Sequence, residues 1–331
     1  MEQVIRAAAP DDIPGLVRLL MSDAKARQST DPALWKIASD APAQISEALT
    51  FALTAAEQPF RQVWLVAETA GQITGVVHSM LLPVPPIYAG SKGDPGLILP
   101  DSFVSPDAPD GTAGSLVAAA EDALRALGAR IILSSWVTGE DWKEAFARRG
   151  YDPLTLYLSR TGFRAQDEAP DVRDASMDDI AGIVRRSAEN RRVLFDIDPF
   201  WEIHPEADAR FGAWMTRSLT LEDRDMRVIG PPGEVAGYVI AQPASRLHFP
   251  PAHDISGTGV IDDFYHHELA DFEEASPNAP GTAGLLHAAE TAFQQRGIDT
   301  AFVVCPAGWH SKIRMLETAG YETAMVWSIR R

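Results

Sequence analysis

Apolar positions along the chain follow two spacings, one typical of helices and one of strands. Continuous apolar runs at 131–136 and 301–305 are typical of strands that are covered on both faces of a sheet. The segments 63–69 and 73–81, separated by Ala70-Gly71-Gln72, predict a hairpin. Amphipathic helices are indicated by apolar residues at helical spacing, which are Leu116, Val117, Ala120, Ala123, Leu124 and Leu127, and again Leu285, Leu286, Ala289, Ala292 and Phe293. The pattern predicts an α/β fold with a mixed central sheet and helices on both faces.

The same pattern occurs twice along the sequence. IRAAAPDDIPGLVR at 5–18 matches VRDASMDDIAGIVR at 172–185, and SPDAPDGTAGSLVAAAE at 105–121 matches SPNAPGTAGLLHAAE at 276–290. Further matches follow in the same order at a nearly constant offset, namely 31–37 with 198–203, 71–77 with 233–239, 85–90 with 250–257, and 148–160 with 318–330. Such self-similarity indicates a duplication. We expect two tandem domains, 1–163 and 172–331, joined by a polar linker at 164–171.

Charge and cysteine content narrow the possible functions. The 331 residues carry 29 Lys and Arg against 46 Asp and Glu, a net charge of −17. A surface that negative repels phosphate backbones and anionic lipid, so we expect neither nucleic acid nor a membrane as partner. The single cysteine, Cys305, excludes an internal disulfide and fits a reducing compartment. We therefore expect a cytoplasmic protein and assign Cys305 to the core.

The order strand–helix–hairpin–strand–turn–helix–strand–helix–strand, with IRxAxxxD at its start and a Gly-Tyr pair near its end, resembles the GNAT superfamily of acyl-CoA-dependent N-acyltransferases. The resemblance covers both halves. It implies acetyl-CoA as co-substrate and the primary amine of a small molecule as acceptor. In that family, a turn of the type Arg/Gln-x-x-Gly-x-Gly/Ala and the following helix N-terminus hold the pyrophosphate. The resemblance implies that the coenzyme-binding residues are Gly281, Thr282, Ala283 and Gly284 with Phe264, and in the first copy Gly111, Thr112, Ala113 and Gly114.

Both turns depart from the family pattern. Ala279 and Pro109 stand where the family has Arg or Gln, so only the last glycine of each turn fits. Asp110 adds a negative charge to the first turn, which makes the second turn the stronger candidate. A helix start leaves unpaired N–H donors that attract anions, and small residues allow close approach. The alternative is a helix entry that binds no ligand.

Candidate catalytic residues concentrate in VIDDFYHHE at 260–268. Acyl transfer to an amine needs a base, because an alkylammonium has no free lone pair. Strand alternation places Asp262, Phe264 and His266 on one face, and Asp263, Tyr265 and His267 on the other. We expect Asp263 or His266 to be the base, with solvated strand-end residues as the alternative. The family's tyrosine that protonates the departing thiolate is replaced by Phe146 and Leu316, which leaves Tyr265 or Tyr321 as possible acids.

The first copy offers a poorer set, Asp101 and Ser102, so we expect the second domain to carry the function. Trp35 and Trp201, in the repeated DP…W segment, either pack or contact the acceptor. No known zinc spacing is present, and we expect no metal. The leading hypothesis is an N-acyltransferase that uses acetyl-CoA or a close acyl-CoA, as a monomer or homodimer. The alternative is a degenerate, non-catalytic GNAT-like protein that binds a ligand or a partner.

Overall fold

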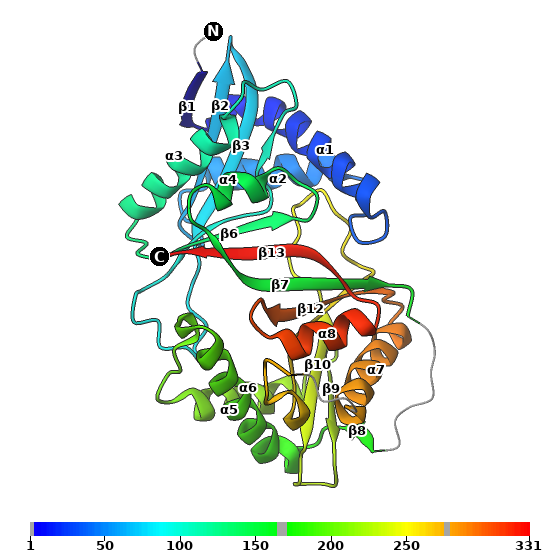
Figure 1. The fold of residues 1–331 in the computed structure, drawn as a ribbon. Coiled ribbons are helices and arrows are strands. Elements are labelled where there is room, and N and C mark those ends of the chain that lie inside the picture. The colour runs from blue at the N-terminus through cyan, green and yellow to red at the C-terminus, as the bar shows by residue number, and fades with distance from the viewer. Residues whose placement is uncertain (1–2, 164–170, 275–278) are drawn as a thin grey trace.

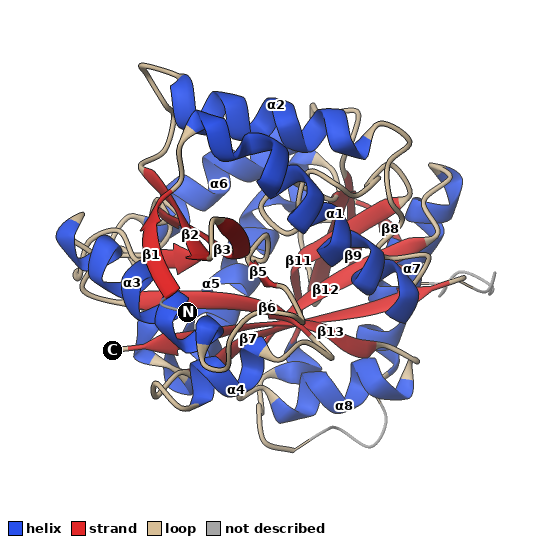
Figure 2. Ribbon diagram, turned by 90° about the horizontal axis from the view of Figure 1, so that it is seen from above, coloured by secondary structure: helices blue, strands red, loops and turns tan. Residues whose placement is uncertain are grey.

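The computed structural model describes residues 3–163, 171–274 and 279–331, and the expected linker 164–171 therefore lies outside the described residues except for Asp171. Its strands form one mixed sheet in the order β1-β2-β3-β4-β6-β13-β7-β12-β11-β10-β9-β8, and β5 pairs with β3. Helices cover both sides of the sheet, with α1 and α2 on one side and α4 and α8 on the other (Figure 2). This confirms the α/β fold expected from the sequence.

The two halves have the predicted order of elements. The first half contains β1 (Gln3–Ala7), α1 (Ile13–Thr30), α2 (Ala41–Thr54), β2 (Gln62–Thr69), β3 (Gln72–Leu81), β4 (Gly96–Ile98), β5 (Phe103–Val104), α3 (Thr112–Ala126), β6 (Ile132–Val137), α4 (Trp142–Ala147) and β7 (Asp152–Thr161). The second half contains β8 (Val172–Asp174), α5 (Ile180–Ile197), α6 (Ala207–Ser218), β9 (Asp225–Ile229), β10 (Gly237–Pro243), β11 (Thr258–His266), α7 (Pro280–Gln295), β12 (Thr300–Pro306), α8 (His310–Thr318) and β13 (Glu322–Arg330).

The repeated Arg and Asp near the start of each half have a structural role. Arg6 contacts Asp12 at 2.7 Å, and Arg173 contacts Asp179 at 2.7 Å. Each aspartate also accepts a backbone N–H at the entry to its helix, from Ala9 at 2.7 Å and from Ser176 at 2.9 Å. Charge-assisted bonds of this kind are the stronger ones. The motif therefore fixes the first strand of each half against its first helix.

The last strands of the two halves are exchanged. β13, the last strand of the second half, pairs antiparallel with β6 of the first half, for example Ser328 with Ser134. β7, the last strand of the first half, pairs antiparallel with β12 of the second half, for example Leu158 with Val303. β7 and β13 also pair with each other across the middle of the molecule (Figure 1). Each half therefore completes the other half's sheet.

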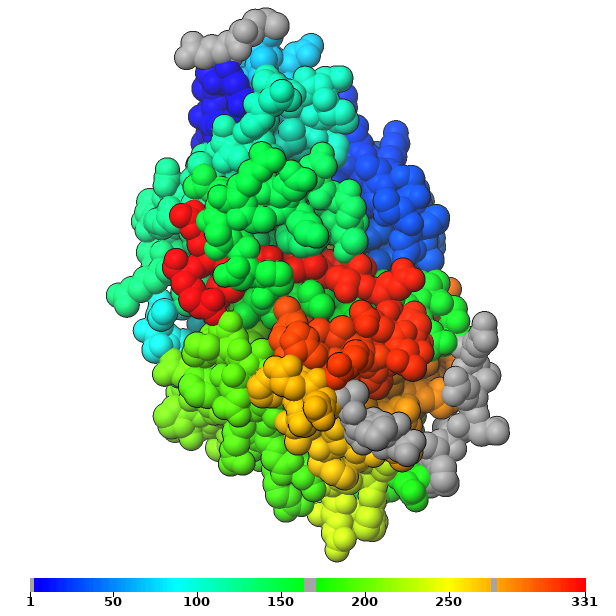
Figure 3. Space-filling model, in the orientation of Figure 1, coloured from blue at the N-terminus to red at the C-terminus, as the bar shows by residue number. Residues whose placement is uncertain are grey.

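Buried ion pairs accompany the exchange. Glu121 on α3, which is fully buried, contacts Arg330 of β13 and, at 2.7 Å, Arg149. Glu290 on α7 contacts Arg160 of β7 at 3.0 Å. The arginines hold the pKa of Glu121 down, at about 2, against the opposing effect of burial. Each exchanged strand thus carries the cation that neutralises a buried carboxylate of the other half. In the space-filling view, the red C-terminal segment crosses the molecule directly below the green segment that contains α4 (Figure 3).

Two Pro-rich loops also cross between the halves. Ile37, after α1, forms an antiparallel bridge with His253, and Tyr88, after β3, forms one with Ile203. Lys36 and Asp254 form an ion pair at 2.8 Å beside the first bridge. The four repeated segments recognised in the sequence therefore meet in two reciprocal pairs. A central core cluster contains side chains from both halves, including Trp35, Tyr157 and Phe302.

Candidate active site

β11 and β12 part at the centre of the second half, and this opening positions the candidate site. The two strands run parallel from the pair Thr258 and Thr300 to the pair Ile261 and Val303. β11 then continues along β10, but the register shifts between the pairs Ile240 with Asp263 and Gln242 with Val260. Two steps along β10 therefore match three steps along β11, which is a β-bulge. A bulge redirects side chains and is frequent next to active sites.

The bulge changes where Asp262 points. Asp262 accepts a hydrogen bond from Gln242 Nε2 at 2.9 Å and lines a cavity that Phe195 of α5 also borders. Asp263 accepts from Tyr238 Oη at 2.5 Å and from Asn190 of α5 at 3.3 Å. The expectation that Asp262 shares a face with Phe264 and His266 is therefore wrong, because the bulge interrupts the alternation. Both aspartates lie on the side of the sheet that α5 covers.

Both carboxylates hold a proton more tightly than usual. Burial, together with the neighbouring charge of Asp263, raises the pKa of Asp262 to about 6. The side chain of Asp262 is exposed to solvent at the cavity that it lines. Burial also raises the pKa of Asp263, and the Tyr238 hydroxyl works in the opposite direction. Asp262 was not among the residues that we selected from the sequence as a base. The feature of the sequence that could have identified Asp262 is its position beside Asp263 at the end of a buried strand.

The cavity has a volume of about 730 Å³ and is built by both halves. Trp201, from the repeated DP…W segment, lies in its wall, whereas Trp35 is buried in the core against Phe249. Tyr88 reaches it from the crossing loop of the first half. Further lining residues include Leu82, Val84, Leu133, Tyr157, Phe200, Leu247, His248, Val260, Val304 and Trp327. A concave, mostly apolar space with few polar groups is typical of small-molecule sites.

A second cleft lies between α7 and α8. Its volume is about 1020 Å³, and its lining includes Ala279 and Ala283 at the start of α7 and Ser311 and Arg314 at the start of α8. Ala279 and Ala283 are small and border the N-terminus of α7, which the family resemblance assigned to the coenzyme. The cleft lies beside α7 and α8, whereas the cavity lies beside α5. The parting of β11 and β12 lies between them.

The N-terminus of α7 is already occupied by the chain. Glu268 accepts hydrogen bonds from both the amide nitrogen and the hydroxyl of Thr282, each at 2.9 Å. The imidazole of His266 lies against Gly281, where an added Cβ would come within 2.5 Å of the ring. Gly284 is buried in the same turn, together with Thr282. A diphosphate fits this turn only when Glu268 has moved away.

His266 itself is held neutral. Burial lowers its pKa to about 4, although Glu268 lies 3.1 Å from its Nδ1 atom. The ring packs at the start of α7, and it does not line the cavity that holds Asp262. The structure therefore brings Asp263 and Asp262 together and places His266 elsewhere.

The first turn is open where the second is closed. Gly111 has a φ of +83°, and an added Cβ at Gly111 or Gly114 would meet no atom within 4 Å. Thr112 is buried and its hydroxyl donates to Pro109 O at 2.6 Å. Ala113 is half-buried beside it. The first turn therefore has more open space around its glycines than the second.

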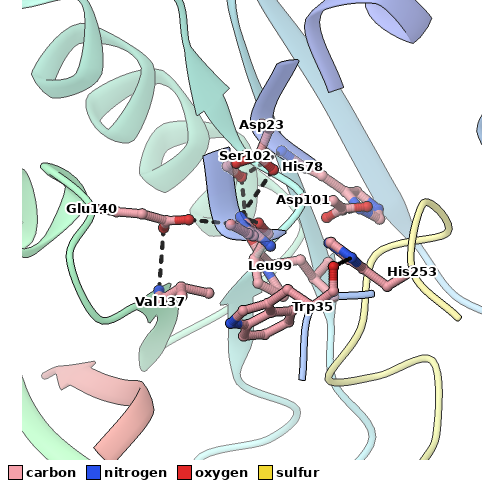
Figure 4. A network of polar contacts seen from close by, with 11 residues as sticks. Asp23, Trp35, His78, Leu99, Asp101, Ser102, Val137, Glu140 and His253 are labelled. Carbon is pink, nitrogen blue, oxygen red and sulfur yellow. Dashed lines mark hydrogen bonds and ion pairs between the residues drawn. The ribbon is translucent and has the colours of Figure 1, made fainter. Parts of the chain in front are cut away.

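Side chains span the parting strands in both halves. In the second half, the ammonium of Lys312 donates to Phe264 O at 2.9 Å and lies 5.1 Å from the centre of the Phe264 ring. Burial lowers the pKa of Lys312. In the first half, Arg27 donates to Pro100 O and, at 2.8 Å, to Glu140 (Figure 4). Sequence reasoning missed both cations, because nothing local marks a lysine or arginine that turns inward.

The first half has a smaller pocket of about 530 Å³ beside Asp101. Asp101 lies 2.8 Å from Nδ1 of His78 (Figure 4). The Trp64 ring stacks on that imidazole, with 3.9 Å between the ring centres. Ser102 accepts a hydrogen bond from the His78 amide at 3.1 Å. These contacts lie between β4 and β5, where the chain leaves regular strand structure.

The candidate acids are core residues. Tyr321 is buried and donates to Glu290 at 2.8 Å, and Tyr265 is buried with a pKa raised by burial to about 12. Neither lines the cavity beside Asp262. Cys305 is buried, as expected, and burial raises its pKa to about 12. Within 3–163, 171–274 and 279–331, no group of three His, Cys, Asp or Glu side chains could hold a metal, and no helix is long and apolar enough to cross a membrane.

Comparison with known proteins identifies the fold. No family model matches the sequence, and no curated protein matches it. Among solved structures, the chain is similar to a tandem GNAT protein from the clavulanic acid biosynthesis pathway, with 14% identity, 99% of this chain and 98% of that chain covered, and a TM-score of 0.50. It is also similar to a GCN5-related N-acetyltransferase from Sphaerobacter thermophilus, with 14% identity, coverage of 99% and 95%, and a TM-score of 0.55. The chain therefore has the tandem GNAT fold, with its two copies joined in one sheet.

Proposed function

We propose that the chain is an N-acyltransferase that moves an acetyl or short acyl group from an acyl-CoA to the amine of a small molecule. The observation that carries this proposal is the place of Asp262. Its carboxylate lies where β11 and β12 part, in the wall of the cavity, on the side opposite α7 and α8. The cavity is the acceptor site, and the cleft between α7 and α8 is the coenzyme site.

Asp262 acts as the base in this proposal. An alkylammonium has a pKa of about 10.4 and must lose a proton before its nitrogen can attack. A base with a pKa near 6 is ionised at neutral pH and still has appreciable proton affinity. Gln242 holds the carboxylate by one oxygen at 2.9 Å. The other oxygen is then available to accept the proton from an ammonium in the cavity.

The residues of the cleft fit the coenzyme only with one rearrangement. When bound, the coenzyme would supply the acyl thioester. Ala279, Ala283 and Ser311 leave room for an elongated ligand, and the Thr282 amide and hydroxyl are donors suited to a phosphate. Those donors now serve Glu268, so this carboxylate has to leave for the diphosphate to bind. Lys312 would place a positive charge at the opening between the strands.

The roles of the two halves follow from these positions. In the first half, Arg27 and Glu140 fill the opening between β4 and β6. The first half therefore serves as a wall of the acceptor cavity. The division into domains at 1–163 and 172–331, the cytoplasmic location and the oligomeric state remain proposals from the sequence.

A second candidate function is a binding protein without catalysis. It is favoured by one observation, the contact of Glu268 with Thr282, because the chain's own carboxylate takes the position of a diphosphate. In that case the cavity would bind its ligand, and the cleft would stay closed.

Thiol release separates the two. Acetyl-CoA is mixed with a panel of amines, free coenzyme thiol is measured with a chromogenic disulfide, and Asp262→Asn is compared with Asp11→Asn, an exposed acid outside the cavity. Thiol release that depends on the amine and on Asp262 supports the transferase. An unchanged melting temperature with millimolar acetyl-CoA, with no thiol released, would overturn it and leave the binding protein.

A further inference from the structure

The walls of the central cavity are unusually rich in aromatic rings. Tyr88 of the first half lies 5.4 Å from Trp201, and Phe200 lies 4.8 Å from the same indole. On another part of the wall, Tyr157 lies 5.6 Å from Trp327. Such walls favour a flat ring that stacks on them.

The charged side chains that line the cavity leave one negative charge in excess, because Arg331 is already paired. Asp262 forms no ion pair with any residue that the structure describes, whereas Arg331 at the rim is paired with Asp198 at 2.5 Å. Burial lowers the pKa of His248 to about 4, so this wall residue is neutral near pH 7. Lys92 and Glu202, which also line the space, have opposite charges. A single positive charge on the ligand would therefore complement Asp262.

Size and polarity exclude other amines. A volume of about 730 Å³ lies in the range of sites for small molecules, and loops of both halves line it. Besides Asp262, the lining includes the carboxylate of Glu202, and elsewhere the second ammonium of a diamine would meet mostly apolar and aromatic groups, which is costly without a partner. The carboxylate of a free amino acid would lie beside Asp262 and repel it.

From these contacts we infer that the central cavity binds a monocationic amine with an aromatic body, its ammonium at Asp262 and its ring between Trp201 and Trp327. The identification of this amine as the acyl acceptor rests on the proposed function. Binding itself does not, because it needs no coenzyme.

The test is calorimetric titration of the full chain at pH 8 without coenzyme. Tryptamine is the probe. Three analogues change the charge or the ring. Indole-3-ethanol lacks the charge, n-butylamine lacks the ring, and putrescine lacks the ring and has a second charge. We expect tryptamine to bind about tenfold tighter or more than each analogue, since a charged pair in a partly buried site adds to ring stacking.

Variants assign the contacts. Asp262→Asn should remove the preference for tryptamine over indole-3-ethanol and leave the melting temperature close to that of the parent. Asp11→Asn is the matched control and should change nothing. Ser245→Trp, on an exposed loop that lines the cavity, should weaken every ligand by filling the space. A preference that survives Asp262→Asn, or tighter binding of n-butylamine or putrescine, would overturn the inference.

The result is separable from the proposed function. Tryptamine binding without thiol release from acetyl-CoA would support the ligand class and count against acyl transfer. Transfer to putrescine and not to tryptamine would support acyl transfer and overturn the ligand class.

Discussion

The carboxylate of Glu268 accepts two hydrogen bonds from Thr282, each 2.9 Å long, and so closes the N-terminus of α7 with the chain's own negative charge. A helix N-terminus has about half a positive charge and stabilises any anion placed there. An incoming diphosphate must therefore compete with Glu268 for the same donors. The affinity for the coenzyme should therefore depend on how strongly Glu268 binds Thr282.

We expect Glu268→Ala to strengthen acetyl-CoA binding by roughly tenfold or more, because it frees two donors and removes a repelling charge. Isothermal titration with acetyl-CoA at low salt measures the change, and Glu57→Ala, an exposed glutamate elsewhere, is the control. An unchanged or weaker affinity would mean that the coenzyme does not bind at α7.

Asp262 and Asp263 should differ in their effect on the reaction. Loss of a general base costs roughly 10² to 10⁴-fold. We expect a loss of that size in kcat/KM for Asp262→Asn, which changes the group in the cavity. For Asp263→Asn, whose side chain contacts Tyr238 and Asn190, we expect a much smaller loss. Initial rates of thiol release decide between them, and the opposite order would restore Asp263 as the base.

The pH dependence of the rate should reflect the same carboxylate. Asp262 must be ionised to accept a proton, and its pKa is raised to about 6. We expect kcat/KM to fall as the pH drops through about 6. A bend near the ordinary aspartate value of about 4, well below 6, would argue against a carboxylate in this setting.

Acid should destabilise the fold through His253. This ring is fully buried, its Nδ1 lies 3.0 Å from Trp35 O, and burial lowers its pKa from 6.5 to about 4. The unfolded chain therefore binds a proton more readily than the folded one below pH 6.5. The stabilisation is fully present above pH 6.5 and is lost as the pH falls towards 4, by up to about 3 kcal/mol for this residue.

Urea unfolding at several pH values between 7.5 and 4.5 tests this expectation. His253→Gln should reduce the pH dependence, whereas His204→Gln, at a partly exposed position, should leave it unchanged. Equal slopes for the parent and His253→Gln would show that this ring does not titrate as proposed.

The exchange of β7 and β13 predicts that neither half folds alone. A fragment of residues 1–163 lacks the neighbour of β6, and a fragment of residues 171–331 lacks the strand that pairs with β12. Glu121 and Glu290 would also lose Arg330 and Arg160. Loss of one partner of a buried pair typically costs about 3 to 5 kcal/mol.

Far-ultraviolet circular dichroism and denaturant titration of each fragment measure the effect, with the co-expressed pair as control. We expect no cooperative transition for either fragment and recovery of the transition for the pair. A fragment of residues 1–163 that unfolds cooperatively by itself would contradict the interdependence.

The sequence was a good guide to the elements because their signals are local. Apolar periodicity located α3, α7, β6 and β12, and the repeat located two copies of one fold. The exchange of β7 and β13 could not be predicted, because both strands have the same pattern whichever neighbour they choose. Strand pairing between distant segments depends on tertiary packing, which periodicity does not report.

The candidate site was predicted only in part for a similar reason. The run at 260–268 was correctly singled out as a dense group of titratable residues, but alternation assigned Asp262 to the wrong face. One extra residue in β11 relative to β10 is enough to turn it, and nothing in the letters IDDFY marks that residue. The partner of Thr282 was equally hidden, because Glu268 lies 14 residues away along the chain.

The reciprocal completion of the two sheets has an evolutionary consequence. A duplicated gene usually frees one copy to decay. Here the deletion of either copy would remove a strand and a buried counter-ion from the other copy. Selection therefore retains both copies even when only one of them is catalytic. The first copy can change at other positions while its terminal strand remains indispensable.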